Sequence, residues 1–289
     1  MRASDLPAPQ SAISPLAFDY IRRLVRKESS IVLDDGKTYL VTSRLGPLAR
    51  ECRFESVAAF ISHLQSTSTG KLHTLAVEAI ATTETSFFRD HHPFAALRDE
   101  ILPEMVRRRS TSRTLSIWSA ACSSGQEPHS IAMILRDRFA NLEGWNLQLA
   151  ASDISRRMTD RAREGLYTQL EVNRGLPAPY LVRFFEQTED RWLLREDVRK
   201  LFRFFHQNLA EPWSVVAPVD ILILRNVLIY FDVDMRREVL RRVRGLLRPD
   251  GYLLLGSAET TLNIDDLFTR VPVGRAVFYQ VTPKKGQER

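Results

Sequence analysis

The stretch from Leu115 to Leu135 restricts the fold of this chain more than any other segment. It begins with the apolar pattern of a buried strand, passes through the small residues Ser119 to Gly125, and continues as a helix with Glu127 and Pro128 in its first turn. Proline is tolerated in a first turn because its missing N–H would have no partner there. A strand, a tight turn and a helix in this order form the first half of a nucleotide-binding βα unit.

The turn lacks the features of a phosphate-binding loop. No lysine follows Gly125, which excludes a P-loop, and one glycine stands where a dinucleotide-binding fingerprint has three. Glu127 also places negative charge where a pyrophosphate needs positive potential. Small residues and a carboxylate suit S-adenosylmethionine (SAM), which carries an ammonium and a sulfonium group and no phosphate. An ordinary strand–helix turn of an α/β protein fits this stretch equally well.

Length and composition set broad limits. The 289 residues are enough for two domains of about 150 residues each. No apolar run approaches the roughly 20 residues of a membrane span, and the N-terminus lacks the apolar core of a signal peptide. Cys52 and Cys122 provide neither a disulfide framework nor a zinc-binding spacing, so we expect a reduced, cytosolic protein without a metal site. The formal net charge of +6 favours an acidic partner, or it reflects a generally basic solvated surface.

The first part of the chain is expected to form a helical domain over residues 15–88, after a disordered stretch at 1–14 that is rich in Ala, Ser and Pro. Apolar residues recur at helical spacing in four segments, which are 16–27, 38–45, 57–64 and 72–81. Gly46-Pro47 is expected to interrupt or restart the second helix. Arg44, Arg50 and Arg53 make this domain basic; they either face solvent or form a dock for an acidic helix.

Strands and helices alternate from residue 89 to residue 283, before a tail at 284–289 that is expected to fray. The expected strands of the main sheet are 115–118, 146–152, 219–224, 252–255, 268–273 and 276–281. Arg248-Pro249-Asp250-Gly251 is expected to be a turn, and the last two strands an antiparallel pair. Residues 177–205 do not fit the repeat; we expect an inserted β subdomain in which 191–195 and 198–205 form a hairpin and the second strand continues into the main sheet.

Polar residues follow the ends of these strands. Asp153 ends the second strand, where a carboxylate in such folds accepts hydrogen bonds from ribose hydroxyls. Asn208 and Asn226 end two further strands, and open α/β sheets bind ligands at the carboxyl ends of their strands. This pattern, with a terminal β-hairpin, indicates the sheet of a class I methyltransferase.

Six segments resemble, in order, the motifs of the chemotaxis receptor methyltransferase family, CheR. They are Thr-Glu-Thr-Ser-Phe-Phe-Arg-Asp (83–90), Ser-Ala-Ala-Cys-Ser-Ser-Gly-Gln-Glu-Pro-His-Ser-Ile-Ala-Met (119–133), Ser-Asp-Ile (152–154), Asn208-Leu209, Arg-Asn-Val-Leu-Ile-Tyr-Phe-Asp (225–232) and Leu-Arg-Pro-Asp-Gly (247–251). Each is weak alone; together they are specific, and the resemblance covers residues 16 to 282. It implies a class I SAM-dependent methyltransferase, with a Rossmann-like, mostly parallel sheet and an antiparallel terminal hairpin. It also implies an N-terminal all-α domain and a small inserted β subdomain.

The resemblance implies an activity and a set of site residues. The activity is methyl transfer from SAM to glutamate side chains of methyl-accepting chemotaxis proteins, which gives glutamate methyl esters and S-adenosylhomocysteine. The implied cofactor contacts are Thr83, Thr85, Arg89, Glu127, Asp153, Asn208, Leu209, Arg225 and Asn226. Thr83 replaces the usual asparagine of the family and can still donate one hydrogen bond. Arg89 and Tyr230 are the candidates for steering the acceptor carboxylate, and Arg89 could instead bind the carboxylate of SAM.

A glutamate acceptor has a reference pKa of about 4.3, so it is ionised at neutral pH and needs no general base. The catalytic task is alignment of the acceptor oxygen with the methyl carbon and the sulfur. His91, His92 and His129 are therefore expected in surface or capping roles, and Cys122 in packing.

The resemblance also implies partners. The basic helical domain is expected to dock helices of the receptors through Arg44, Arg50 and Arg53, and the protein is expected to be a monomer that neither binds nucleic acid nor inserts into a membrane. Family members that tether to a C-terminal receptor pentapeptide have a longer, glycine-containing turn in the β subdomain. Residues 186–194 are short here and contain no glycine, so we expect activity without this tether.

Two other functions stay open. The pI of about 9.5 suits a nucleic-acid methyltransferase, but amino-group methylation of bases typically uses Asn/Asp-Pro-Pro-Tyr/Phe where this chain has Arg225-Asn226-Val227-Leu228. The second is a non-catalytic module that senses SAM and regulates a partner.

Overall fold

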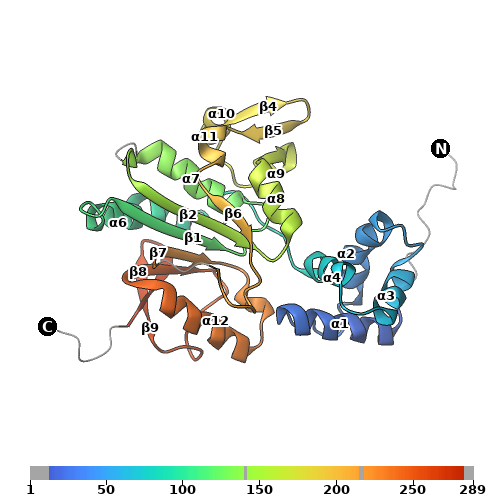
Figure 1. The fold of residues 1–289 in the computed structure, drawn as a ribbon. Coiled ribbons are helices and arrows are strands. Elements are labelled where there is room, and N and C mark those ends of the chain that lie inside the picture. The colour runs from blue at the N-terminus through green and yellow to red at the C-terminus, as the bar shows by residue number, and fades with distance from the viewer. Residues whose placement is uncertain (1–12, 140–141, 215–217, 283–289) are drawn as a thin grey trace. The chain divides into compact units, whose positions relative to one another are not determined.

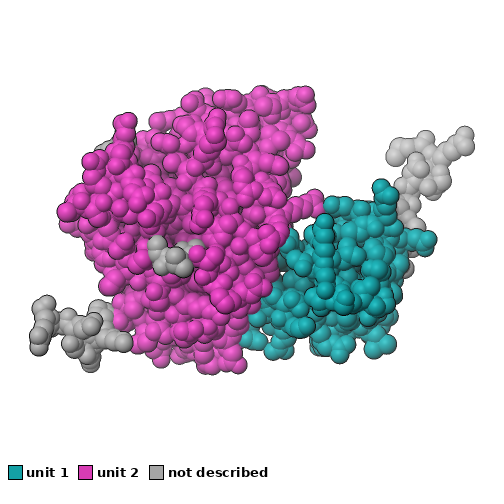
Figure 2. Space-filling model, viewed as in Figure 1, with its two compact units in different colours: residues 1–82, 230–232 teal, residues 83–229, 233–289 magenta. Residues whose placement is uncertain are grey.

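The computed structural model describes residues 13–139, 142–214 and 218–282 and divides the chain into two compact units, coloured separately in Figure 2. The smaller unit extends to Thr82 and includes Tyr230–Asp232, and the larger unit holds the rest. The predicted boundary at residue 88 is too late, because Phe87 is buried in the larger unit against Tyr167 and Phe185. The predictions for residues 1–12 and 284–289 lie outside the described residues.

The smaller unit consists of helices. They are α1 (Pro15–Ser29), α2 (Thr38–Glu51), α3 (Val57–Ser66) and α4 (Lys71–Ile80) (Figure 1). Residues 13 and 14 were expected to be disordered, but Ile13 is buried and the hydroxyl of Ser14 caps α1 by accepting from the N–H of Ala17 at 3.2 Å. Pro15 follows at the first helical position, where its fixed φ favours the helix.

The second helix runs through Gly46-Pro47 instead of breaking there. Pro47 forfeits only one backbone hydrogen bond, and the helix buries Val41, Leu45 and Leu48 in the core of the unit. Burial of these three side chains compensates for the missing bond, since each is worth roughly 1.5–3 kcal/mol.

The larger unit is built on a seven-stranded sheet of order β6-β2-β1-β7-β8-β10-β9. The strands are β1 (Thr114–Ala120), β2 (Asn146–Asp153), β6 (Arg203–His206), β7 (Val219–Leu224), β8 (Leu247–Leu255), β9 (Phe268–Val273) and β10 (Ala276–Val281). β6, β2, β1, β7 and β8 are parallel, whereas β10 is antiparallel to both β8 and β9. Every residue of β7 is buried, as expected of a central parallel strand.

Helices cover both faces of the sheet. The helices and helical turns after residue 83, those of the inserted subdomain included, are α5 (His92–Ala96), a π-helical turn η1 (Leu97–Ile101), α6 (Leu102–Arg108), α7 (Gln126–Arg138), α8 (Arg156–Glu164), α9 (Gln169–Asn173), α10 (Ala178–Phe184), α11 (Glu196–Arg199), the 3₁₀ turn η3 (Leu228–Tyr230) and α12 (Val233–Leu246). Figure 1 shows α7 and α12 on opposite sides of the sheet. α7 connects β1 to β2 and α12 connects β7 to β8, which are steps in opposite directions along the strand order. Right-handed crossovers therefore place the two helices on opposite faces. Within the described ranges, no helix combines the length and apolar content that crossing a membrane requires.

The inserted subdomain pairs differently from the prediction. It is a three-stranded antiparallel sheet of β3 (Leu166–Thr168), β5 (Arg191–Leu194) and β4 (Phe185–Thr188), in the order β3-β5-β4, so it begins before residue 177. The predicted hairpin of 191–195 with 198–205 is wrong: residues 196–199 are α11, and β6 pairs with β2 alone. The alternating pattern of β6 resembles a hairpin strand, but its partner is far away in the sequence.

A second correction concerns the predicted turn at 248–251. These residues lie inside β8, where the register against β7 shifts between Val219 and Ile221. A Cβ on Gly251 would lie 2.9 Å from the carbonyl oxygen of Asp220, so only glycine fits this irregularity. Residues 248–251 therefore form an irregularity inside β8 instead of a turn between α12 and the strand.

A buried charge cluster lies at the amino-terminal edge of the sheet. The fully buried carboxylate of Asp220 accepts from the N–H of Ser116 at 2.8 Å and from Nε of Arg109 at 2.7 Å. Arg109 also donates to both carboxylate oxygens of Asp250, at 2.6 and 2.9 Å, which holds the pKa of Asp250 below its usual value. The cluster joins α6 to β7 and β8.

Replacing Asp220 with alanine should therefore destabilise the protein strongly, because Arg109 would lose a buried counter-charge. We expect the free energy of unfolding, measured by urea denaturation, to fall by about 3–5 kcal/mol. Asp234→Ala is the matched control: its exposed ion pair with Arg237 should contribute less than about 1 kcal/mol. Equal effects of the two substitutions would contradict this account of the cluster.

Candidate functional site

The turn between β1 and α7 is held in an unusual backbone conformation. Ala121 and Ser123 have φ values of 57° and 50°, and Gly125 has φ 92°. A Cβ on Gly125 would lie 2.7 Å from Cβ of Ala162 on α8, so this glycine is required by backbone conformation and helix packing rather than by close approach of a ligand. Further residues with positive φ lie in the other candidate segments, at Phe88, Asp90, His91 and Asn226. Such strained backbone occurs preferentially at functional sites.

The carboxylate of Asp153 ties this turn to the end of β2. Its Oδ2 accepts from the N–H of Ser123 at 2.8 Å, and its Oδ1 accepts from the N–H of Ser155 at 2.9 Å. Asp153 is buried, and Ser155 caps α8. The carboxylate of Asp153 therefore lies at the carboxyl end of β2, where such folds bind ribose hydroxyls.

Glu127 is paired within the protein. Its Oε1 accepts from the hydroxyl of Ser119 at 2.8 Å, and its Oε2 accepts from Nη1 of Arg225 at 3.1 Å. The sequence suggested that this carboxylate could meet a cation, and the cation in the structure is Arg225 at the end of β7.

Arg225 connects three segments of the larger unit. Its side chain is only 2% exposed, and besides Glu127 it donates from Nη2 to Oδ2 of Asp90 at 2.6 Å and to the carbonyl oxygen of Arg89 at 3.1 Å. Its guanidinium also lies 5.7 Å from the ring centroid of Phe94. The buried Nε of Arg225 has no acceptor in the part of the chain that the structure describes. A buried donor of this kind is costly unless a ligand or water satisfies it.

The segment 83–90 lies against the same turns. The hydroxyl of Ser123 donates to the carbonyl oxygen of Thr83 at 2.6 Å. Arg89 is half-buried, and Nη1 donates to the carbonyl oxygen of Glu84 at 3.3 Å, which leaves most of its N–H groups available. Within residues 13–139, 142–214 and 218–282, neither the hydroxyl of Thr83 nor that of Thr85 has a hydrogen-bond partner, so both are available to a ligand.

Asn208 and Leu209 follow β6, beside Asp153. The N–H of Gln207 donates to the carbonyl oxygen of Asp153 at 2.9 Å, which fixes the two strand ends together. Asn208 and Leu209 are both buried; the side-chain oxygen of Asn208 accepts from the N–H of Ala210 at 3.0 Å. Nine of the ten predicted site residues belong to the larger unit, and most lie on strand ends that these bonds join.

Tyr230, the tenth, belongs to the smaller unit. Its carbonyl oxygen accepts from the N–H of Val32 at 2.9 Å, Phe231 forms a β-bridge with Ile31, and Asp232 accepts from Arg26 at 3.1 Å. The residues 230–232 thus pack as a part of the helical unit, and the role of Tyr230 stays a prediction.

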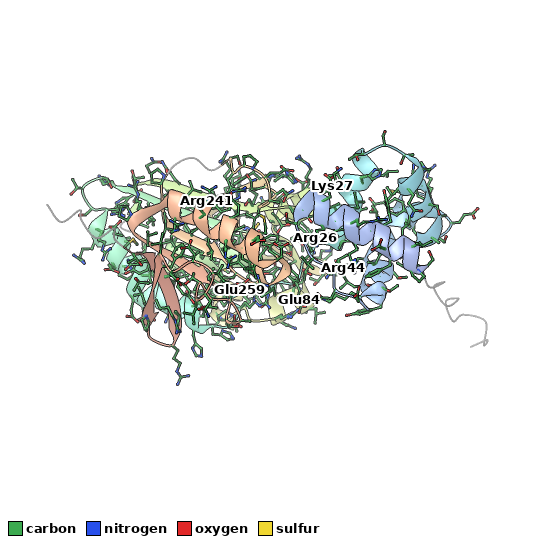
Figure 3. All side chains as sticks on the ribbon, turned by 90° about the horizontal axis from the view of Figure 1, so that it is seen from below. Arg26, Lys27, Arg44, Glu84, Arg241 and Glu259 are labelled. Carbon is green, nitrogen blue, oxygen red and sulfur yellow. The ribbon has the colours of Figure 1, made fainter. Side chains whose placement is uncertain are left out.

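The predicted docking arginines differ from one another. Arg44 donates to the carbonyl oxygen of Ile80 at 2.6 Å and to the hydroxyl of Thr82 at 3.3 Å, and burial lowers its pKa. Arg44, labelled in Figure 3, therefore caps the end of α4, and its role in docking stays a prediction. Arg50 and Arg53 are exposed, and neither has a carboxylate partner among the residues described.

Sequence reasoning missed Glu259, which is labelled in Figure 3. Its buried carboxylate accepts from the N–H groups of Asn226 at 2.7 Å, Val227 at 2.9 Å and Gly256 at 2.7 Å. It therefore fixes the turn after β7 that carries Arg225 and Asn226. An acidic residue three positions after the glycine that ends a strand is a weak signal, because nothing in the sequence shows that it reaches back to β7.

Sequence reasoning also missed Tyr167 of β3. Its hydroxyl donates to the carbonyl oxygen of Ser124 at 2.8 Å, so the inserted sheet is bonded directly to the turn after β1. The hydroxyl has one hydrogen, so Nδ1 of His129, at 2.8 Å, must donate to it, and Nε2 is then unprotonated. Burial lowers the pKa of His129 to about 3, and it raises the pKa of the Cys122 thiol. Cys122 is buried in a packing role, as the sequence predicted, whereas His129 is fully buried and the expectation of a surface or capping role for it is wrong.

His129 makes stability depend on pH. Its folded pKa of about 3 lies below the ordinary value of 6.5, so the unfolded chain alone takes up a proton as pH falls through this window. We expect His129 to contribute a loss of up to about 1.4 kcal/mol in unfolding free energy per pH unit below 6.5. In His129→Gln, the stability gap to the wild type should shrink between about pH 8 and about pH 5. A gap that stays constant over this range would show that His129 protonates equally in both states.

Comparisons with known proteins agree with this geometry. Residues 83–277 match the SAM binding domain of CheR methyltransferases, and residues 16–80 match the all-alpha domain of the same family. The chain is 38% identical to chemotaxis protein methyltransferase 1 of Vibrio cholerae, over 90% of this chain and 94% of that protein. It is 36% identical to chemotaxis protein methyltransferase 1 of Pseudomonas aeruginosa, over 91% of this chain and 97% of that protein. The predicted class I, SAM-binding fold and the family resemblance are thus confirmed, and the chain belongs to the CheR methyltransferase family.

Proposed function

We propose that this methyltransferase is a protein-glutamate O-methyltransferase, which converts glutamate side chains of methyl-accepting chemotaxis proteins to methyl esters. The observation that carries the proposal is the set of strand ends joined around Arg225 and Asp153, at the edge where α/β sheets bind ligands. The names of the relatives, chemotaxis protein methyltransferases, support the class of acceptor.

The residues at this edge fit SAM. Asp153 lies at the end of β2, where a carboxylate binds ribose hydroxyls in such folds, and Asn208 and Leu209 follow the neighbouring strand β6, on the side proposed for the adenine. The buried Nε–H of Arg225 needs an acceptor, and SAM carries a carboxylate. When bound, SAM supplies the methyl group on a positively charged sulfur.

The role of the protein is to position an acceptor that is already ionised. A glutamate with a reference pKa of about 4.3 needs no base, and His129, the buried histidine nearest the turn in sequence, is neutral and packed against Tyr167 and Phe204. Holding the reacting atoms in line can supply roughly 7–11 kcal/mol of the barrier. Arg89 is our first candidate for orienting the acceptor carboxylate, because most donors of its guanidinium are free; Tyr230 is the second.

Incubation with methyl-labelled SAM and cytoplasmic receptor fragments tests the proposal. We expect transfer of label to protein as base-labile esters, and Arg89→Ala should lower turnover by about 10²–10³-fold. Arg98→Ala is the matched control, since Arg98 pairs with Asp99 on the surface of the same unit. Transfer to purified DNA or RNA instead would support the nucleic-acid alternative, and SAM binding without transfer would support a sensing module. Normal turnover of Arg89→Ala would remove Arg89 from the site.

We further propose that a monomer acts in the cytoplasm and that Arg50 and Arg53 dock an acidic receptor surface, without a role for nucleic acid or membrane insertion. Both side chains are exposed and carry unpaired charge within the described part of the smaller unit. Such charges speed encounter with an acidic partner, and the effect weakens with salt.

The inserted subdomain supports activity without a receptor tether. Only Glu189 and Asp190 separate β4 from β5, so the turn is short. We expect a calorimetric titration with the C-terminal receptor pentapeptide to show no binding. A dissociation constant in the micromolar range would overturn this part of the proposal.

A further inference from the structure

A pocket lies in the larger unit at the same edge of the sheet as Asp153, but beyond β7, at the end of β8. It has a volume of about 260 Å³ and is lined by α5, the end of β8 and the β9–β10 hairpin. The residues that matter for its chemistry are Asp90, His92, Glu259, Arg270, Arg275 and Tyr279.

The sheet topology places this pocket beside the candidate cofactor site. β10 runs antiparallel to β8, with Phe278 opposite Leu254, so the hairpin turn that carries Arg275 lies at the carboxyl end of β8. β7 is parallel to β8 and ends at the same edge, where Arg225 follows it. Asp90 lines the pocket and is itself the 2.6 Å partner of Arg225. The pocket is therefore continuous with the segments that surround the site.

The two acidic residues of the pocket each have partners of their own. Glu259 accepts backbone N–H groups from Asn226, Val227 and Gly256, and Asp90 is paired with Arg225. Within the described residues, neither carboxylate forms an ion pair with Arg270 or Arg275.

The two arginines of the pocket have no ion-pair partner in the part of the chain that the structure describes. Arg270 and Arg275 are exposed, and no carboxylate of the described residues lies within ion-pair distance of either. Glu100 is close to the turn, with its Oε1 3.7 Å from the position of a Cβ on Gly274, but it forms no ion pair with them. Arg270 lies opposite the buried Tyr279 in the hairpin, so the pocket combines an aromatic side chain with two guanidinium groups that have no ion-pair partner among the described residues.

We propose that Arg270 and Arg275 form a subsite for a second carboxylate of the acceptor protein, next to the one that receives the methyl group. The inference rests on the proposed function. A guanidinium binds a carboxylate through two parallel hydrogen bonds, and two of them around a small pocket select an acidic side chain over a neutral one. The enzyme then prefers acceptor glutamates that lie in acidic segments, and the preference weakens as salt rises.

Two synthetic peptides test the subsite, one with a central glutamate flanked by glutamates and one with the same glutamate flanked by glutamines. We expect the wild type to methylate the acidic peptide with about tenfold higher kcat/KM at low salt. Arg270→Gln/Arg275→Gln should lose this preference and still methylate the neutral peptide at the wild-type rate. Arg107→Gln, which removes an exposed arginine from α6, is the matched control and should keep the preference.

Peptide binding in the presence of S-adenosylhomocysteine separates this inference from the proposed function. If neither peptide is methylated, the proposed function fails. The subsite is still supported if the wild type binds the acidic peptide more tightly than the neutral one and the double variant does not. Equal kcat/KM and equal affinity of the wild type for the two peptides would overturn the subsite. A preference for the acidic peptide that persists in the double variant would also overturn it.

Discussion

One buried guanidinium holds together the parts of the larger unit on which the site depends. Arg225 bonds Glu127 at the start of α7, Asp90 in the junction segment and the carbonyl oxygen of Arg89. Each of these segments comes from a different part of the sequence. Without the cation, the buried carboxylate of Glu127 would lose its counter-charge, and breaking a buried pair costs about 3–5 kcal/mol.

Two carboxylates extend this arrangement by accepting hydrogen bonds from backbone N–H groups. Asp153 fixes the turn after β1 to the end of β2, and Glu259 fixes the turn after β7 to the end of β8. Both turns contain residues with positive φ, a conformation that needs such support. The strand ends therefore form one connected edge. Among the described residues, Arg89, Arg270 and Arg275 at this edge have no ion-pair partner. A rigid edge suits a reaction that depends on alignment rather than on proton transfer.

Features with a local cause were predictable from the sequence. The buried strands and the ends of the terminal hairpin follow from hydrophobic periodicity. The class of fold and the family were also predictable, because the motifs occur in order along the chain.

Features with a distant cause were not predictable. The bulge in β8 depends on how Gly251 packs against Asp220. β6 pairs with β2 and not with β5, which is closer to it in the sequence. Arg44 could be recognised as a helix cap only once Ile80 was placed beside it. Glu259 and Tyr167 act through hydrogen bonds to residues more than 30 positions away in the chain, so no pattern near them indicated a role.

The most direct test of this account is the affinity for S-adenosylhomocysteine, measured by calorimetry on Arg225→Lys. A lysine keeps the charge but cannot bridge Glu127, Asp90 and the carbonyl oxygen of Arg89 at once. Arg109→Lys is the matched control, because it weakens a buried bridge between Asp220 and Asp250 at the other edge of the sheet. The account predicts that Arg225→Lys weakens binding by about tenfold or more while Arg109→Lys leaves it unchanged. Wild-type affinity in Arg225→Lys would contradict it.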